Sequence, residues 1–245
     1  MNSAVTHISP DLFEDLYICL RQEEGRLYTD EEVARLPVVD TGHRYHKEWG
    51  IRKQSCKKLL NYIKSKGKFL RILEVGCGNG WLCGQLATIG KTAVTGIDIN
   101  GMELKQAERV FANIPNLNFR YGSLADTYPQ DEKFDLIIFA ASIQYFASFK
   151  QVVQAAVERL TLQGEIHILD SHFYQQQQLP AARQRTKAYF DSIGFGRMAP
   201  HYFHHALSEL EHFQYKILQD PLDWKNKFFI NQNPFYWVAI KNRYS

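Results

Sequence analysis

The stretch that decides the fold is Leu73-Glu74-Val75-Gly76-Cys77-Gly78-Asn79-Gly80. It ends a short apolar run, Phe69 to Val75, that predicts a buried strand, and it precedes a helical pattern from Trp81 to Ile89. Glycine adopts backbone conformations that other residues avoid, and a helix that begins after such a turn offers unpaired N–H groups. The stretch therefore predicts a strand, a tight turn and a helix that together hold a ligand.

Strand and helix patterns alternate after this turn. Helical stripes separate apolar strands predicted at residues 92–99, 117–121, 134–140 and 164–169. Such alternation is typical of a parallel sheet covered by helices on both faces. Two closing strands, 213–219 and 235–241, are expected to pair as an antiparallel edge. We expect an α/β, doubly wound, Rossmann-like fold with a mostly parallel seven-stranded sheet and an antiparallel C-terminal edge.

Two segments fall outside this rhythm. Residues 1–50 are polar and irregular, with apolar positions between Leu12 and Leu20 that suit one amphipathic helix, and we expect an N-terminal cap there. Residues 51–245 are expected to form the ligand-binding domain, with a cap insertion at 171–212 between its fifth and sixth strands. That insertion carries a glutamine run, a helical pattern from Pro180 to Ile193 and a histidine-rich segment.

Composition excludes several classes of protein. The 245 residues are 45% hydrophobic and 22% charged, which is typical of a globular protein, and the net charge of +3 is too small to indicate a polyanionic partner. Apolar runs such as 136–143 are far too short to span a bilayer, and residues 1–20 carry acids where a signal peptide would be apolar. The four cysteines have no CxxC spacing, so we expect reduced thiols and a cytoplasmic protein.

The residues around the turn indicate which ligand it holds. Asp98 ends the second predicted strand, where a carboxylate accepts both hydroxyls of a ribose, whether in a nicotinamide cofactor or in another nucleoside. Bulky Trp81 stands where a dinucleotide motif requires glycine, and Glu74 would repel a pyrophosphate. An acid at that position instead suits a ligand with an ammonium group and a cationic sulfur, as in S-adenosylmethionine.

From about Arg71 to Asp170 the chain resembles the class I S-adenosylmethionine-dependent methyltransferases, particularly the group that acts on small molecules. The resemblance rests on the glycine motif, Asp98, the strand ends and the turn at 160–164. It implies that Glu74, Gly76 and Gly78 line the methionine part, that Asp98 holds the ribose, and that Ile99 packs on the adenine. The expected cofactor-binding set is Glu74, Gly76, Cys77, Gly78, Gly80, Asp98, Ile99, Ser123, Leu124 and Ala140.

One position departs from the family pattern. Members of the group often carry an acid where Ser123 stands, to accept the adenine amine, and a serine accepts more weakly. Asp126 is the expected substitute. Leu124 is expected to offer its backbone N–H to the adenine.

Methyl transfer from a sulfonium chiefly requires alignment of the reacting atoms in a dry pocket, and a general base is optional. Tyr145, after the fourth strand, and His172, after the fifth, are the candidate catalytic residues, and either could equally serve as a wall of the pocket. Tyr45, Trp49, Phe173, Tyr174, Tyr202 and Phe203 are expected to form an aromatic lid, which favours a planar or lipophilic acceptor. Asn233-Pro234-Phe235-Tyr236 has the letters of a motif found in amino-methylating nucleic-acid enzymes, but it is expected to begin a closing strand.

The predicted function is transfer of a methyl group from S-adenosylmethionine to an O, N or C atom of a small-molecule acceptor, leaving S-adenosylhomocysteine. The alternatives are a non-catalytic S-adenosylmethionine-binding module and an NAD-dependent oxidoreductase. The histidines at 201, 204 and 205 lack a carboxylate or cysteine that would complete a metal set, so no metal is expected. We expect a monomer or homodimer without a nucleic-acid or membrane partner.

Overall fold

A computed structural model describes residues 10–124, 132–223 and 232–242 of the chain. Three helices precede the sheet: α1 (Pro10–Glu23), α2 (Asp30–Arg35) and α3 (His46–Ser65). Thr29 caps α2, because its hydroxyl accepts from the Glu32 N–H at 3.2 Å while the Glu32 carboxylate accepts from the Thr29 N–H at 2.8 Å. Helix α3 starts at His46, so the expected boundary between residues 50 and 51 falls inside a continuous helix.

The main sheet has seven strands in the order β3-β2-β1-β4-β5-β9-β8, and β9 pairs antiparallel with both of its neighbours. The predicted fold class is therefore confirmed, including the antiparallel edge. The strands are β1 (Leu70–Val75), β2 (Thr92–Asp98), β3 (Leu117–Tyr121), β4 (Phe134–Ala140), β5 (Leu160–Ser171), β8 (Tyr215–Gln219) and β9 (Tyr236–Lys241). Since the order reverses between β1 and β4, ligands are expected outside the carboxyl ends of these strands.

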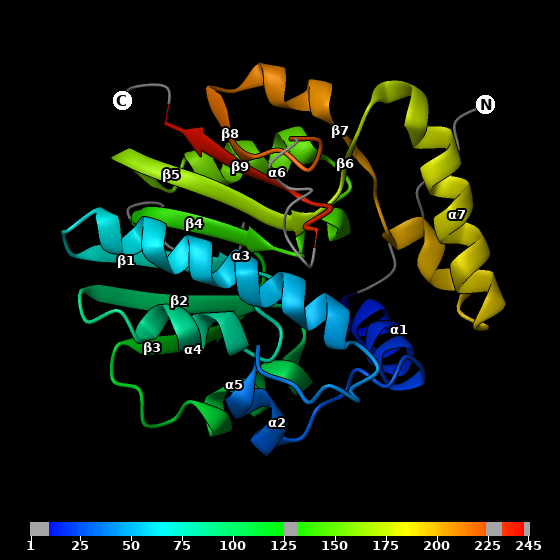
Figure 1. Ribbon diagram of the computed structural model, residues 1–245, viewed down its shortest axis with the longest axis horizontal. Coiled ribbons are helices and arrows are strands. Elements are labelled where there is room, and N and C mark those ends of the chain that lie inside the picture. The colour runs from blue at the N-terminus through cyan, green and yellow to red at the C-terminus, as the bar shows by residue number, and fades with distance from the viewer. Residues whose placement is uncertain (1–9, 125–131, 224–231, 243–245) are drawn as a thin grey trace.

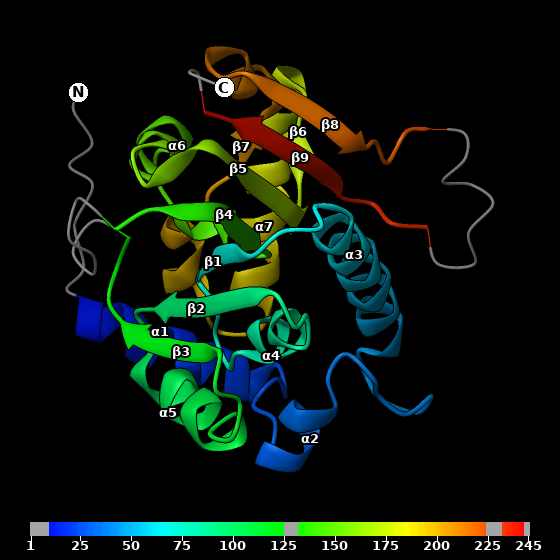
Figure 2. The same cartoon turned by 90° about the vertical axis from the view of Figure 1, so that its left-hand side faces the viewer.

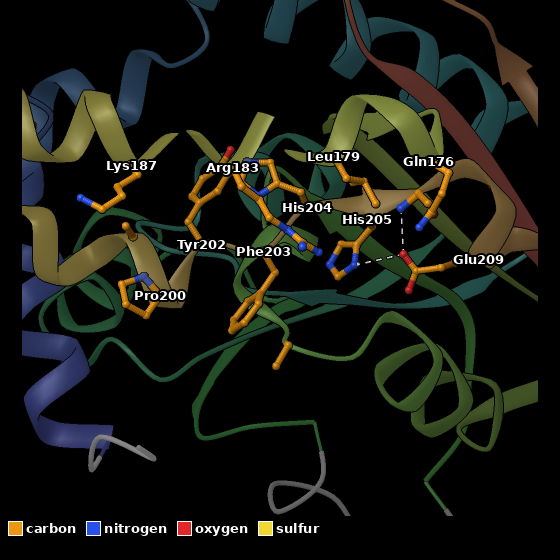
Figure 3. A pocket seen from close by; sticks show the side chains of 13 residues that line it. Gln176, Leu179, Arg183, Lys187, Pro200, Tyr202, Phe203, His204, His205 and Glu209 are labelled. Carbon is orange, nitrogen blue, oxygen red and sulfur yellow. Dashed lines mark hydrogen bonds and ion pairs between the residues drawn. The ribbon is translucent and has the colours of Figure 1, made fainter. Parts of the chain in front are cut away.

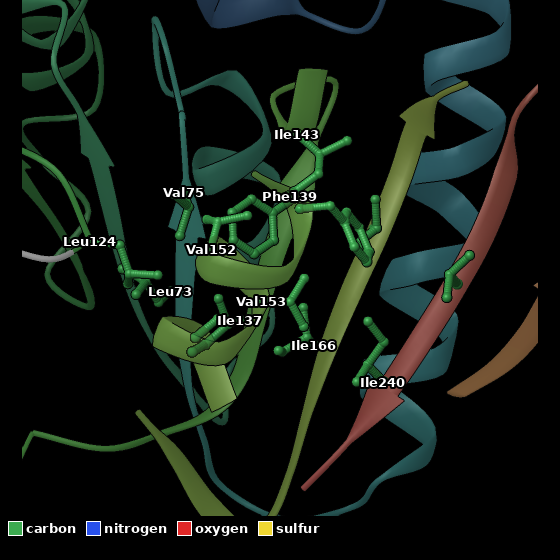
Figure 4. Close-up of a cluster of buried hydrophobic side chains, with 14 of the residues drawn as sticks. Leu73, Val75, Leu124, Ile137, Phe139, Ile143, Val152, Val153, Ile166 and Ile240 are labelled. Carbon is green, nitrogen blue, oxygen red and sulfur yellow. The ribbon is translucent and has the colours of Figure 1, made fainter. Parts of the chain in front are cut away.

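Helices cover both faces of the sheet (Figure 2). On one face, α3, α4 (Trp81–Ala87) and α5 (Gly101–Val110) enclose a core that includes Leu59, Leu82 and Leu104. On the other face, α6 (Phe149–Val157) packs over β4 and β5 and buries Phe139 and Val153 completely (Figure 4). The two-sided burial explains why β4 is apolar at almost every position.

A cap lies beyond one end of the strands and combines two segments that are far apart in the sequence (Figure 1). One is α1, and the other is the segment between β5 and β8. This second segment contains β6 (Phe173–Tyr174), η2 (Gln176–Gln178), α7 (Leu179–Ser192), η3 (Gly196–His201), β7 (His205–Ala206) and η4 (Leu207–His212). Leu20 of α1, Phe190 of α7 and Met198 of η3 form a small core of their own. The cap is therefore one packed unit, which forms only when both segments are folded.

Candidate active site

The glycine turn between β1 and α4 lies tightly against the loop after β4. Gly76 has φ +73°, and a Cβ built there would lie 2.6 Å from the Cβ of Ser142. The Ser142 hydroxyl donates to the Val75 carbonyl at 2.6 Å, and the Gly76 N–H donates to the Ile97 carbonyl at 2.8 Å. The carboxyl ends of β1, β2 and β4 are thus joined at one point, and only glycine fits between them.

Glu74, the acid before the first glycine, is buried. Its carboxylate accepts from the Cys83 thiol of α4 at 2.9 Å, and burial raises the pKa of Glu74 to about 8. Cys77 beside it is also buried, and burial raises the pKa of its thiol to about 11, which makes it a packing residue and a poor nucleophile. Among the described residues no basic side chain forms an ion pair or hydrogen bond with Glu74, as expected of a group that receives a cation.

Asp98 lies opposite this turn at the end of β2. Its carboxylate accepts from the Gly78 N–H at 2.7 Å and from the Asn100 N–H at 2.9 Å, while burial raises its pKa. Glu103 of α5 approaches the same turn, since a Cβ on Gly78 would lie 3.2 Å from the Glu103 carboxylate. Burial raises the pKa of Glu103 to about 7. The glycine turn is therefore surrounded by three carboxyl groups that a positively charged ligand would stabilise as carboxylates.

The remaining predicted cofactor residues lie at the ends of neighbouring strands. Ile99 follows β2 and stays half-buried, Ala140 ends β4, and Ser123 and Leu124 follow β3. The Leu124 side chain packs into the core of the sheet, which leaves only its backbone for a ligand. Asp126 lies outside the described residues. All four residues lie at the carboxyl edge of the sheet, and their contact with the adenine stays a prediction.

Sequence reasoning missed a strained pair of residues at this edge. Ala141 and Asp170 both have φ +54°, and among the described residues they are the non-glycine positions with positive φ. Ala141 directly follows β4, and Asp170 is the penultimate residue of β5. The Ala141 N–H donates to the Leu169 carbonyl at 3.0 Å. Backbone strain of this kind concentrates at functional sites. No single-residue signal in the sequence predicts it, because alanine rarely adopts this conformation and aspartate, although enriched there, more often adopts others.

Asp170 belongs to a buried polar network that includes the motif at 233–236. Ser55 of α3 donates to the Asp170 carboxylate at 2.6 Å, and Asn233 donates to Ser55 at 3.0 Å. Because β9 runs antiparallel to β5, Asn233 before β9 lies beside the carboxyl end of β5. As predicted, the motif precedes a closing strand, but the structure also brings its first residue close to the site. Burial raises the pKa of Asp170 to about 6.

Two arginines supply positive charge at this edge, and the sequence did not single out either. The charge of Arg52, on α3, lowers the pKa values of both Glu74 and Asp170, although burial raises them more. Arg21, on α1, is half-buried, with its guanidinium 5.6 Å from the Tyr17 ring and paired with Glu24 at 3.5 Å. Its Nε is buried and has no hydrogen-bond partner among the described residues, and a buried N–H of this kind is costly unless a ligand accepts from it.

The two candidate catalytic residues have different surroundings. Tyr145 is inside the cap, where its ring lies 5.6 Å from that of Tyr17 and 5.8 Å from that of Tyr202, and burial raises its pKa. His172 is exposed just beyond β5, with its ring 4.6 Å from the Phe235 ring, and burial together with the charge of Arg185 lowers its pKa. His172 is therefore neutral near pH 7, the state that a general base requires.

The aromatic lid has a different membership from the predicted one. Phe173 packs into the sheet core against Phe149, and Trp49 packs against Trp81 on the opposite face. Of the expected set, Tyr202 lies in the cap core, together with aromatic residues of α1 that the prediction left out. The prediction was wrong for Phe173 and Trp49, because aromatic residues in this chain also fill the two faces of the sheet. In the described part of the chain, no cluster of three histidine, cysteine or acidic residues could hold a metal.

Comparison with known proteins identifies the family. Residues 66–227 match the methyltransferase-domain family, which is more than half of the chain. The chain belongs to this family. The match starts before β1 and includes the glycine turn, Asp98 and α7, so it contains every residue of the predicted site.

Curated relatives of this methyltransferase-family protein include the malonyl-[acyl-carrier protein] O-methyltransferase of Bacillus cereus. It is 26% identical over 147 residues, or 58% of this chain and 54% of the relative. A ubiquinone biosynthesis O-methyltransferase of Bartonella tribocorum is 29% identical over 96 residues, covering 39% of this chain and 38% of the relative. The chain thus aligns with about half or less of the length of these relatives.

Solved structures show the same fold. The plantazolicin methyltransferase BpumL, in complex with a monoazolic desmethylPZN analog and SAH, aligns with a TM-score of 0.58 at 16% identity, covering 96% of this chain and 98% of that one. The YcgJ protein of Bacillus subtilis aligns with a TM-score of 0.59 at 16% identity, over 78% of this chain and 99% of that one. These likenesses confirm the Rossmann-like methyltransferase fold. In the part of the chain that can be described, no helix is long and apolar enough to cross a membrane.

Proposed function

We propose that the protein transfers the methyl group of S-adenosylmethionine to an O, N or C atom of a small-molecule acceptor and releases S-adenosylhomocysteine. The observation that carries this proposal is the buried Glu74 beneath a glycine turn, with Asp98 opposite it. Glu74 suits the ammonium group and the cationic sulfur, and the Asp98 carboxylate suits the ribose hydroxyls. Arg52 offers a positive charge for the carboxylate of the methionine part.

The residues fit this cofactor better than a dinucleotide. Trp81, the first residue of α4, is buried against Trp49 with the ring centroids 5.4 Å apart, so a bulky core residue stands where a dinucleotide motif needs glycine for close packing of the helix on the strand. The three carboxyl groups around the turn would repel a pyrophosphate and attract a sulfonium. Membership of the methyltransferase-domain family and the SAH present in the BpumL complex support the same choice.

When bound, the cofactor supplies an already activated methyl group, so the protein chiefly has to orient the acceptor and exclude water. The cap over the strand ends supplies that exclusion. His172, neutral and at the end of β5, is the better candidate for removing a proton from a hydroxyl or amine acceptor, because the pKa of Tyr145 is raised. The four cysteines are free thiols, which supports the proposed cytoplasmic location. A monomer or homodimer without a nucleic-acid partner is part of the same proposal.

Calorimetry with purified protein tests the cofactor assignment. We expect S-adenosylhomocysteine to bind, Asp98→Ala to weaken binding by about tenfold or more, and the exposed control Asp40→Ala to leave it unchanged. Stronger binding of NADH than of S-adenosylhomocysteine would favour the oxidoreductase. Transfer of a labelled methyl group to components of a metabolite extract then separates an enzyme from a non-catalytic binding module.

A further inference from the structure

A basic groove lies in the cap, outside the residues assigned to the cofactor. Its volume is about 640 Å³, within the range of small-molecule sites. Helix α7 forms one wall, with Arg183 and Lys187, and residues 199–206 form the other, while Glu209 lies at one end (Figure 3). We call this feature the α7 groove.

The positive charge of the α7 groove is only partly neutralised. Arg183 and Lys187 are one helical turn apart, so both project from the same face of α7. Lys187 is paired with Asp191 at 2.5 Å, whereas Arg183 forms no ion pair or side-chain hydrogen bond within the described residues. Glu209, the carboxylate that lines the groove, already accepts from the Ala206 N–H at 2.7 Å. Arg183 is therefore available to an incoming anion.

The other wall offers neutral hydrogen-bonding and aromatic groups. Burial and the charges of Arg183 and its neighbours lower the pKa of His204 to about 4, so its ring is neutral near pH 7. Its Nε2 lies 2.8 Å from the Thr186 hydroxyl. Tyr202 and Phe203 line the same wall and suit an apolar portion of a ligand. One guanidinium above an aromatic wall is suited to a ligand that is anionic at one end and apolar along its length.

The α7 groove is joined to the edge of the sheet where the reaction is proposed to occur. The Phe203 N–H donates to the Gln144 carbonyl at 2.7 Å, in the loop directly after β4. The Tyr202 ring lies 5.8 Å from the Tyr145 ring, and Ala147 of the same loop lines the groove. A ligand in the groove would therefore extend toward the carboxyl ends of the strands.

We propose that the α7 groove binds an anionic group, a phosphate or a carboxylate, that the methyl acceptor carries at a distance from its reacting atom. The proposal rests on the proposed function and narrows its substrate class to acidic acceptors. Arg183 donates charge-assisted hydrogen bonds to the anionic group. The rings of Tyr202 and Phe203 contact the apolar part of the acceptor, between its anionic group and the atom that receives the methyl group.

The test measures binding of inorganic phosphate, malonate and neutral glycerol by NMR titration, with and without S-adenosylhomocysteine. We expect saturable binding of at least one anion and none of glycerol. Arg183→Glu should weaken anion binding by about tenfold or more, because a charge-assisted hydrogen bond is lost, and Arg183→Lys should retain most of it. A preference between phosphate and malonate identifies which anionic group the acceptor carries.

The matched control is Lys91→Glu, the same reversal of charge at an exposed position directly before β2, at the opposite end of the strands from the cap. It should change anion affinity by less than about twofold, since an exposed distant charge is screened by salt. An equal loss in Lys91→Glu and Arg183→Glu overturns the proposal, and so does the absence of saturable binding of both anions. A tenfold loss of S-adenosylhomocysteine affinity in Arg183→Glu also overturns it, because the groove would then belong to the cofactor.

The same measurements separate the two proposals. If the protein binds phosphate through Arg183 but does not bind S-adenosylhomocysteine, the proposed methyl transfer fails while an anion site remains. If S-adenosylhomocysteine binds and neither anion does, the proposed function stands and the acidic acceptor is rejected.

Discussion

Cofactor binding should release a proton from Glu74. In the free protein burial holds the pKa of this carboxyl at about 8, so at pH 7 about 0.9 of the molecules carry the proton. A ligand with an ammonium and a sulfonium group favours the ionised carboxylate, and binding should therefore release up to about 0.9 proton from Glu74 at pH 7, falling to about 0.1 at pH 9. Between pH 9 and pH 6 the affinity should fall by up to about a hundredfold, since each pH unit below the pKa weakens binding about tenfold.

The assay is calorimetry of S-adenosylmethionine binding in two buffers with different ionisation enthalpies, at pH 6, 7, 8 and 9. The difference in heat between the buffers gives the number of protons released. Glu74→Gln removes the titrating group, so its proton release at pH 7 should fall to the part contributed by Glu103. A control at the opposite end of the sheet, Glu132→Gln, should behave as wild type, because Glu132 pairs with Arg71 at the start of β1.

Two results refute this reasoning. One is a wild-type release below about 0.2 proton at pH 7, which means that Glu74 is already ionised in the free protein. The other is unchanged release in Glu74→Gln, which assigns the proton to another group.

Three further predictions follow from the site. Gly80→Ala should lower the free energy of unfolding by about 2 to 4 kcal/mol in urea titrations, because its φ is positive and a Cβ would lie 2.6 Å from the Phe119 ring; a loss below about 0.5 kcal/mol contradicts this. His172→Ala should lower kcat by about a hundredfold without changing cofactor affinity, whereas Tyr145→Phe should stay within about threefold; the reverse order assigns the base to Tyr145. Since the pKa of Glu74 is raised in the folded state, the native protein binds more protons than the unfolded chain, and thermal stability should fall as pH rises from about 5 to 8. Glu74→Gln should flatten that slope in scanning calorimetry.

Local patterns were sufficient to predict the sheet. Strands β3 and β4 have the predicted bounds, since each is a short apolar or alternating run between clear turn signals. Helix α3 begins earlier than its apolar stripe, because His46 and the residues after it precede the first buried position at Trp49. The glycine turn and Asp98 could be placed because both directly follow strands that have an unambiguous pattern.

The rest of the site depends on contacts between distant segments. Arg21 enters the site from α1, and Arg52 from α3, and neither has a local pattern that distinguishes it from a solvated arginine. The α7 groove exists only because residues 199–206 fold back along α7. The strained Asp170 is hydrogen-bonded by Ser55, more than a hundred residues away in the sequence. Such placements are set by tertiary packing, which single-sequence patterns do not encode.

The shared core of the cap limits which parts of this protein can be exchanged separately. Because Leu20 packs with Phe190 and Met198, an exchange of the 171–212 segment for that of a relative would place a foreign surface against an unchanged first helix. Chimaeras in which only residues 171–212 come from a relative are expected to expose apolar side chains. Chimaeras in which both this segment and the first helix come from the same relative should remain compact. A change of acceptor preference would then require matched changes in two stretches of sequence, one on each side of the cofactor motif.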